Sequence, residues 1–378
     1  MQARTHRFPP DPWCLREAAP DAASHFLNET LFALGNGYIG VRGTAEEGWS
    51  GPGGTSRDGT YLNGFYESES IHYPETAYAL AKTNQFMLNV PNAKGIGIWI
   101  SDANEPAGER FDPLQGTLES YERSLDLRQG VLERSLTWTS PSGRSIAVHS
   151  RRLVCLDNRH LLALEVSVTP LNFSGTVRIV SSLDGAVQNL EAGDDPRIGS
   201  AVSGASLQLL SAEQEGDFSA LVQRTRNSGF MLVSATLTEV DGKDAPEAHC
   251  SRDDLRLEQS YAIPAAQGEK ITVRKYACYH TSRDYDESEL MPRSCDLLDT
   301  AKREGFDALA ARQAAYLAGF WQQSDVEIDG DDLLQQGIRF NQYHLLQSVG
   351  RDGKTNISAK GVTGEGYEGH YFWDTDIY

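Results

Sequence analysis

The apolar residues of this chain change their spacing once, near Asp284, and that change limits the fold more than any other feature. Between about residues 135 and 280, short runs of alternating apolar and polar residues are separated by Gly, Asn, Asp and Pro. In GFMLVSATL (229–237), every second residue from Met231 to Leu237 is apolar, which is typical of a sheet half buried against another layer. Many such strands predict a large antiparallel β-sandwich.

After Asp284 the sequence favours helices. Residues 294–323 are rich in Ala, Leu and charged residues and contain few β-branched residues. Residues 329–350 follow, with an acidic start, a glycine at the end and one apolar face made of Leu334, Ile338, Leu345 and Val349. The sequence contains few other helices against which these could pack. We therefore expect that they are the start of a helical domain.

Residues 1–134 are rich in Gly and Tyr, and we expect long loops carried on a few strands of the same β domain. An aromatic cluster lies within them, and it has two readings. It either packs in the core and anchors loops, or it forms one wall of a binding cleft. Its members are Tyr61, Phe65, Tyr66, Tyr73 and Tyr78.

Charge and cysteine usage exclude several classes of protein. A net charge of −19 and a pI near 4.9 argue against binding to nucleic acid or to an anionic membrane, because both need clustered Lys and Arg. The five widely spaced cysteines form no Cys-x-x-Cys pair, so we expect reduced thiols and a cytoplasmic protein without structural zinc. The N-terminus has no apolar leader segment.

Two stretches match Gly-x-Gly-x-x-Gly, GNGYIG (35–40) and GEGYEG (364–369). A dinucleotide site needs a strand before this motif and an amphipathic helix that opens at its third glycine. Neither stretch has that context, because VRGTAEEGWSGPGG follows the first and an aromatic run follows the second. Both are predicted to be either glycine-rich turns or loops in which the backbone makes a close approach.

The chain closes on GHYFWDTD (369–376) and two further residues, and this stretch allows three interpretations. Asp374 and Asp376 could share a cation with His370, although no third carboxylate lies nearby in the sequence, and we expect no metal. Trp373 beside Asp374 could bind a sugar, with the indole covering the C–H face of the ring and the carboxylate accepting hydrogen bonds from hydroxyls. Ordinary packing with a capping aspartate is the third reading.

Three long stretches, in order, resemble the signature stretches of the family 65 glycoside hydrolases, which include maltose, trehalose, kojibiose and nigerose phosphorylases. They are ETLFALGNGYIGVRG (29–43), LDLRQGVLERSLTW (125–138) and KGVTGEGYEGHYFWDTDIY (360–378). The resemblance implies an N-terminal β-sandwich domain (1–280), a helical linker (281–326) and the truncated start of an (α/α)₆ catalytic barrel (327–378). Family members are about twice this length, so we expect an N-terminal fragment.

The chemistry that the resemblance implies is inverting phosphorolysis of a disaccharide to β-glucose 1-phosphate and a free sugar. The partners would be the disaccharide and inorganic phosphate as co-substrate, with no cofactor, and the full-length protein would be a homodimer. A glutamic acid protonates the leaving oxygen while phosphate attacks the opposite face of the ring. We expect that general acid beyond Tyr378, in a later part of the barrel. We therefore expect no catalytic residue in this chain. Glu365 and Glu368 are not assigned the role of general acid.

The resemblance carries over to the Trp373–Asp374 pair, which matches the pair that holds glucose. His370 and Phe372 lie in the same loop and are expected to position it. Asp376 stands where the family often has glutamate, so its role is open. Two other functions remain open, a hydrolase of the same family acting on an α-glucoside, and a non-catalytic carbohydrate-binding or assembly module.

Overall fold

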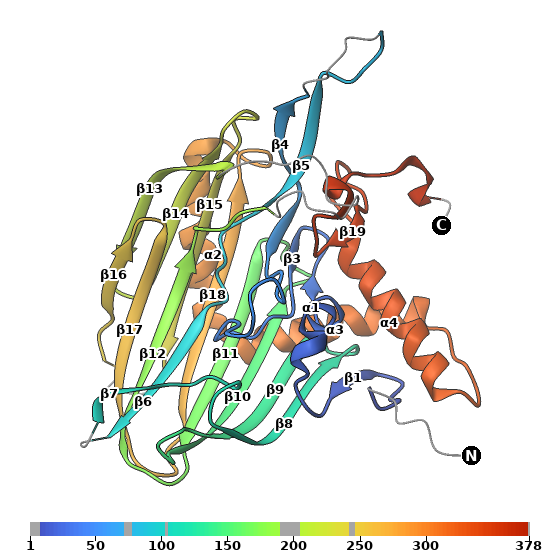
Figure 1. Cartoon of the computed structure of the whole chain (residues 1–378). Coiled ribbons are helices and arrows are strands. Elements are labelled where there is room, and N and C mark those ends of the chain that lie inside the picture. Colours follow the sequence, from blue (N-terminus) through green and yellow to red (C-terminus); the bar gives the residue numbers. More distant parts are fainter. Residues whose placement is uncertain (1–7, 72–77, 103–104, 190–204, 242–245, 377–378) are drawn as a thin grey trace.

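A nine-stranded antiparallel sheet is the largest layer of the structure (Figure 1). The computed structural model describes residues 8–71, 78–102, 105–189, 205–241 and 246–376. In spatial order the sheet contains β1 (Cys14–Glu17), β8 (Thr117–Asp126), β9 (Val131–Thr139), β10 (Ser145–Val154), β11 (Leu161–Pro170), β18 (Ile271–Thr281), β15 (Met231–Val240), β14 (Phe218–Thr225) and β13 (Leu207–Glu215).

A five-stranded sheet packs against this layer and completes the predicted sandwich. Its strands in spatial order are β16 (His249–Asp253), β17 (Arg256–Ala265), β12 (Gly175–Asp184), β6 (Ile96–Asp102) and β7 (Glu105–Arg110). Alternate residues of β6 and β12, such as Ile98 and Ile179, meet Trp138 and Val166 of the larger sheet in one buried cluster. The period-two pattern in the sequence therefore produces the inner faces of a sandwich.

The N-terminal third holds more strands than expected. Besides strands of the two large sheets, it forms a four-stranded sheet of β2 (Leu34–Gly35), β3 (Ile39–Val41), β4 (Thr60–Ser70) and β5 (Thr83–Asn89). The short strands β2 and β3 are too brief for their alternation to be visible in the sequence. Strands β4 and β5 form a hairpin that projects from the body of the molecule (Figure 1).

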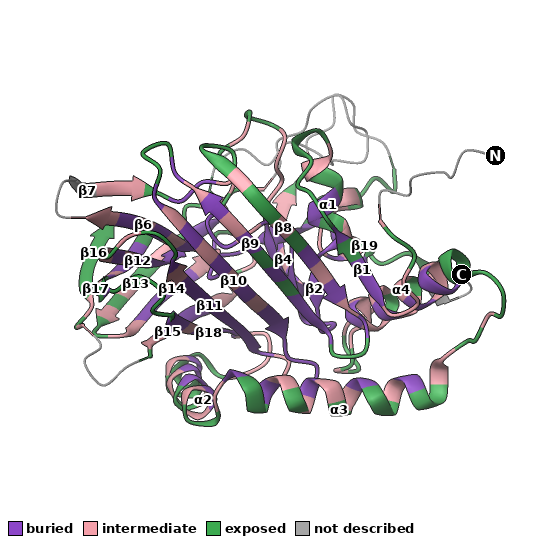
Figure 2. Ribbon diagram, turned by 90° about the horizontal axis from the view of Figure 1, so that it is seen from below, coloured by how far each residue is buried: buried purple, intermediate pink, exposed green. Residues whose placement is uncertain are grey.

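Two helices cover the face of the nine-stranded sheet that is turned away from the five-stranded sheet (Figure 2). They are α2 (Leu290–Glu304) and α3 (Phe306–Ser324), and they are separated at Gly305, whose φ is 80°. Leu298 of α2 packs in a buried cluster with Val233 and Ala235 of β15. The expectation of a half-buried sheet is therefore wrong for β15, which is buried on both faces because α2 covers the second one.

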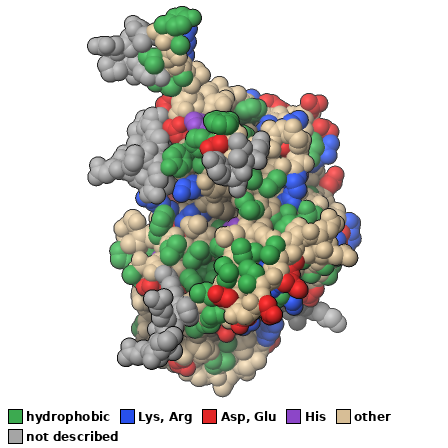
Figure 3. Space-filling view, turned by 90° about the vertical axis from the view of Figure 1, so that its right-hand side faces the viewer, with side chains coloured by type: hydrophobic (Ala, Val, Ile, Leu, Met, Phe, Trp, Pro, Cys, Tyr) green, Lys and Arg blue, Asp and Glu red, His purple; other side chains and the backbone are tan. Residues whose placement is uncertain are grey.

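Helix α4 (Asp332–Ser348) leaves two leucines of its predicted apolar face exposed. The side chains that it buries against the β domain are mainly polar, namely Gln335, Gln336, Arg339, Tyr343 and Gln347. Leu334 and Leu345, which the sequence places on the apolar face, are exposed, and hydrophobic side chains gather on the side of the molecule that carries α4 (Figure 3). An exposed apolar helix face is typical of a surface that another element covers.

The remaining elements are short. They are the helix α1 (His25–Leu31), the strand β19 (Ala359–Val362) and four 3₁₀ turns at Ala22–Ser24, Glu287–Glu289, Gly366–Gly369 and Trp373–Asp376. Among the described residues, no helix is long and apolar enough to cross a membrane. The five cysteines are free thiols.

A candidate sugar-binding loop

The segment after β19 folds into a tight, strained turn. The last four residues of GEGYEG form the 3₁₀ turn Gly366–Gly369, in which Tyr367 and Glu368 have φ of 56° and 58° and Gly369 has φ of 72°. A left-handed conformation costs a residue other than glycine about 1–2 kcal/mol, so it persists only where the surroundings enforce it. No helix of the dinucleotide-binding kind opens at Gly369, and the interpretation as a turn is confirmed.

Two tyrosine hydroxyls of β4 hold this turn in place. The Tyr61 hydroxyl donates to the buried carboxylate of Glu365 at 3.0 Å, and the Tyr66 hydroxyl donates to the carbonyl oxygen of Gly369. Burial raises the pKa of Tyr61, and the nearby charge of Glu365 raises it further, so the phenol stays protonated and can donate. The turn is thereby fixed at both ends to one strand of the β domain.

Two more polar side chains of the β domain extend this anchoring. Asn63 accepts a hydrogen bond from the Tyr371 hydroxyl at 2.5 Å and donates to the carbonyl oxygen of Asn356 at 2.9 Å. Arg42 donates to the carbonyl oxygen of Thr363 at 2.9 Å. Contacts from strand β4 and from the residue that follows β3 therefore set the position of the whole segment that leads to Trp373.

The other glycine motif, GNGYIG, makes room for the same segment. It forms the β2–β3 hairpin, with Gly37 at φ of 83°. A Cβ atom on Gly37 would lie 1.9 Å from the carbonyl oxygen of Val349, and one on Gly40 would lie 1.5 Å from that of Val362. The predicted close backbone approach is confirmed, and the group approached is the chain's own C-terminal segment.

Glu29 is a buried carboxylate that organises the loop beside this hairpin. It accepts hydrogen bonds from the Arg57 N–H at 2.9 Å, from the Ser56 hydroxyl and from Arg42 at 3.3 Å. Burial alone would raise the pKa of Glu29, but hydrogen bonds from His25, Ser56 and the Arg57 N–H, together with the charge of Arg42, lower it to about 2. The ionised form is therefore part of the folded structure.

We expect Glu29→Gln to lower the free energy of unfolding at pH 7 by about 3 kcal/mol. Because the folded-state pKa is below the unfolded value, the stabilisation is present above about pH 4.5 and is lost as the pH falls towards 2. Urea denaturation at pH 7, 5 and 3 measures it, and the gap between wild type and variant should shrink. Glu327→Gln, at an exposed position, is the matched control and should stay within about 0.5 kcal/mol of wild type. A constant gap from pH 7 to pH 3 would contradict the assignment.

The two residues predicted to contact sugar lie at the end of this anchored segment. Trp373 is 85% exposed and begins the last 3₁₀ turn, and Asp374 follows it at a half-buried position. The backbone of Asp376 closes the same turn. An indole next to a carboxylate offers an apolar face and a hydrogen-bond acceptor side by side, which is the chemistry that a sugar ring needs.

Of the two predicted positioning residues, His370 contacts strand β5 and Phe372 packs within the segment. The His370 ring lies with Nε2 2.6 Å from the carbonyl oxygen of Gln85 in β5, to which it donates. Phe372 is partly exposed and meets Tyr367 edge to face, with ring centroids 5.7 Å apart. Both residues are close to Trp373 in sequence. Their roles in binding remain predictions.

The predicted position of the general acid, beyond Tyr378, is not tested by the structure. Tyr378 itself lies outside the described residues, which end at Asp376. Of the two glutamates in the turn that precedes Trp373, Glu365 is buried and accepts the hydrogen bond from Tyr61. The absence of a catalytic residue from this chain therefore stays a prediction.

The residues of the aromatic cluster predicted in the N-terminal third have different environments in the structure. Tyr61 and Phe65 are buried, Tyr66 anchors the turn, and Tyr78 is fully exposed, whereas Tyr73 lies outside the described residues. Loop anchoring, one of the two readings, is thus confirmed for Tyr61 and Tyr66. Sequence reasoning missed Asn63 and Arg42, although an asparagine within the apolar run TYLNGFY was a usable signal.

Two family models match the chain. The model described as "Glycosyl hydrolase family 65, N-terminal domain" matches residues 15–320. The chain belongs to glycosyl hydrolase family 65. The model of the central catalytic domain of family 65 matches residues 339–378, which contain the anchored loop.

Several family 65 relatives are similar along nearly the whole chain. An α,α-trehalose phosphorylase of Thermoanaerobacter brockii is 44% identical over 98% of this chain and 47% of its own length. A second, from Geobacillus stearothermophilus, is 37% identical over 94% and 45%, and a maltose phosphorylase of Bacillus subtilis is 28% identical over 98% and 47%. The chain spans about half the length of the curated relatives that it matches.

A solved protein described as a putative kojibiose phosphorylase from the human microbiome shares the fold. It superposes with a TM-score of 0.86 at 24% identity, covering all of this chain and 47% of the other. At that identity the likeness supports the β-sandwich architecture alone.

Proposed function

We propose that the complete protein is an inverting α-glucosyl disaccharide phosphorylase that acts on α,α-trehalose, and that this chain supplies one wall of its glucose subsite. The observation that carries the proposal is that the β domain fixes the loop bearing the adjacent Trp373 and Asp374 by several hydrogen bonds. The reaction takes trehalose and inorganic phosphate to β-glucose 1-phosphate and glucose.

The residues of this chain bind and orient the sugar. The Trp373 indole covers the apolar C–H face of the pyranose, and the Asp374 carboxylate accepts hydrogen bonds from adjacent hydroxyls. His370 and Phe372 support the turn. A site that is fixed before the substrate arrives loses little entropy on binding, which is the value of the Tyr61 and Tyr66 anchors.

We place the proton donor beyond Tyr378. Glu365 is buried and accepts a hydrogen bond from Tyr61, so it is engaged in holding the turn. The relatives are about twice as long, and we assign the glutamic acid that protonates the leaving oxygen to the part of the catalytic domain that the chain does not span. Helix α4 would begin the helical barrel, with its exposed Leu334 and Leu345 covered by barrel helices.

Trehalose is favoured over other disaccharides by similarity. Two trehalose phosphorylases share 44% and 37% identity with the chain, whereas a kojibiose phosphorylase of Halothermothrix orenii shares 29%. Phosphate acts as co-substrate, and we propose no cofactor, a cytoplasmic location and a homodimer. A trehalose-hydrolysing enzyme of the same family is the second candidate, because the fold and the sugar loop are compatible with either nucleophile.

The deciding assay offers trehalose, kojibiose, maltose and nigerose to the complete protein, each with and without phosphate. We expect release of glucose from trehalose that depends on phosphate, and no turnover by the 378-residue chain alone, because its proton donor is missing. Glucose release at the same rate without phosphate would favour the hydrolase. Glucose 1-phosphate formed by the chain that ends at Tyr378 would overturn the placement of the acid.

A further inference from the structure

The turn between β14 and β15 (residues 226–230) holds strand β4 beside the sugar loop (residues 363–376). Strand β3 pairs only with residues 60–62 of β4, so it leaves one edge of β4 open from Tyr66 to Ser68. The turn fills this place. The Ser228 hydroxyl donates to the carbonyl oxygen of Tyr66 at 2.9 Å, and the Asn227 side chain donates to that of Ser68 at 2.7 Å. Carbonyl groups two residues apart point to the same edge of a strand, so the turn satisfies the edge that β3 leaves open.

A buried carboxylate lies at the centre of this contact. Glu67 is 1% exposed, and its side chain accepts hydrogen bonds from the backbone N–H groups of Ser228 at 2.7 Å and of Asn227 at 2.9 Å. The two bonds end on different oxygens, so both oxygens of the carboxylate are occupied by the turn. A hydrogen bond from an N–H group to a carboxylate is stronger than one between neutral groups. Glu67 therefore contributes the strongest contact between the turn and β4.

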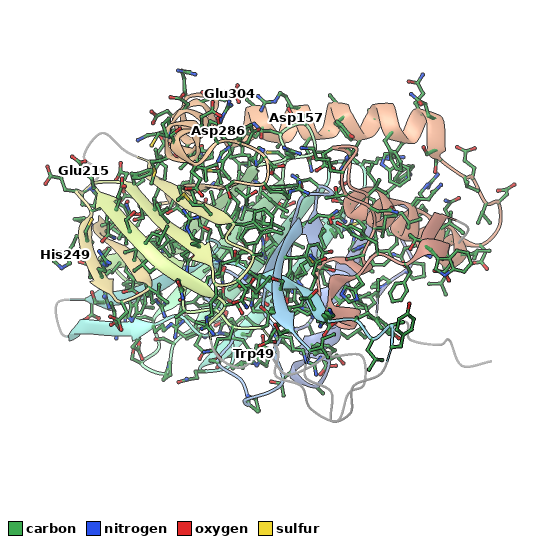
Figure 4. The ribbon with its side chains drawn as sticks, turned by 90° about the horizontal axis from the view of Figure 1, so that it is seen from above. Trp49, Asp157, Glu215, His249, Asp286 and Glu304 are labelled. Carbon is green, nitrogen blue, oxygen red and sulfur yellow. The ribbon has the colours of Figure 1, made fainter. Side chains whose placement is uncertain are left out.

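The same stretch of β4, together with β5, carries the sugar loop. Tyr66, whose carbonyl oxygen the turn holds, donates its hydroxyl to Gly369 and meets Tyr371 edge to face, with ring centroids 6.1 Å apart. On β5, the carbonyl oxygen of Gln85 accepts from His370 at 2.6 Å. Figure 1 shows the blue β4–β5 hairpin between the olive strands β13 to β15 and the red C-terminal segment, and Figure 4 shows the same order from above. The turn supports the hairpin, and the hairpin supports the loop.

We propose that Glu67 is a positioning residue of the glucose subsite. By fixing β4 to the β14–β15 turn, it sets the place at which Tyr66 holds Gly369. The loop that continues from Gly369 to Trp373 and Asp374 follows this place. The inference rests on the proposed sugar-binding role of that loop, and Glu67 acts through Tyr66 and not on the sugar. A misplacement of about 1 Å can cost about 100-fold in rate, so a support one strand away from the loop affects the reaction.

Hydrogen exchange of the complete protein tests this link without reference to the reaction. The N–H groups of Glu368 and His370 are bonded within the turn of the sugar loop. We expect Glu67→Gln to raise their exchange rates at least about fivefold, together with those of the β14–β15 turn, because an amide presents an acceptor oxygen to only one of the two N–H groups. Glu69→Gln, at a partly exposed position two residues further along β4, is the matched control and should leave both regions unchanged.

Steady-state kinetics of the same variants with trehalose and phosphate separate positioning from a loss of stability. A purely structural defect reduces the amount of active enzyme and leaves the KM for trehalose unchanged. We expect Glu67→Gln to raise the KM for trehalose at least about fivefold and to lower kcat about tenfold, with the KM for phosphate within about twofold of wild type. Glu69→Gln should match wild type in all three constants.

A second variant decides the matter if Glu67→Gln does not fold. Ser228→Ala removes the hydroxyl that donates to Tyr66 and leaves Glu67 in place, and we expect the same changes at about a third of the size. Faster exchange in the β14–β15 turn alone, or a wild-type KM for trehalose in a folded and active variant, would overturn the proposal. If the wild-type complete protein does not turn over trehalose, the proposed function fails, whereas faster exchange at Glu368 and His370 still supports the link from the turn to the loop.

Discussion

Asp374→Ala in the complete protein is expected to lower kcat/KM for its disaccharide by about 100-fold or more. The variant leaves sugar hydroxyls without an acceptor, and the lost charge-assisted hydrogen bonds correspond to about 3 kcal/mol. If the bonds strengthen as the glucosyl ring gains positive charge, kcat falls along with kcat/KM. Initial-rate kinetics with and without saturating phosphate measure both constants.

Two further variants make this result specific. Asp374→Asn keeps the shape and loses the charge, so it should lie between wild type and Asp374→Ala. Asp329→Ala changes an exposed aspartate of the connection between α3 and α4 and should leave kcat/KM within about twofold. Unchanged kinetics in Asp374→Ala would remove this residue from the sugar site.

Gly40→Ala is expected to disturb the docking of the C-terminal segment on the β domain. The added Cβ atom would lie 1.5 Å from the carbonyl oxygen of Val362 and 2.4 Å from its carbonyl carbon, and neither backbone atom can rotate away. Strands β3 and β19 must separate, which we expect to lower the free energy of unfolding by about 3 kcal/mol. A shift of about 1 Å in the loop should also lower kcat about 100-fold.

Gly337→Ala is the matched control for this change. Gly337 lies in α4, and a Cβ atom there would meet nothing within 4 Å. Replacing a helical glycine by alanine should raise the free energy of unfolding by about 0.5–1 kcal/mol. If Gly40→Ala were as stable and as active as wild type, the close approach of β3 and β19 would not position the loop.

The sequence was sufficient to predict the sandwich and the helices, because both depend on repeated local patterns. Alternation from Met231 to Leu237 identifies β15, and the Ala- and Leu-rich stretch identifies α2 and α3. What covers each face is not a local property. The second buried face of β15 and the outward turn of Leu345 on α4 depend on packing between distant segments.

The candidate site shows the same division. The Trp373–Asp374 pair is visible in sequence because its two side chains are adjacent and carry complementary chemistry. The groups that hold the loop, such as Tyr66 and Asn63, lie about 300 residues away along the chain. The glycines at 37 and 40 showed that a backbone comes close, yet only the fold shows that it belongs to Val349 and Val362.

The anomeric form of the phosphorylated product decides whether the complete protein is an inverting phosphorylase. Proton and phosphorus NMR of the complete protein with trehalose and phosphate follows the first product before it can react further. We expect β-glucose 1-phosphate and one equivalent of free glucose. Formation of α-glucose 1-phosphate, or of two equivalents of glucose with phosphate unconsumed, would contradict the proposed reaction.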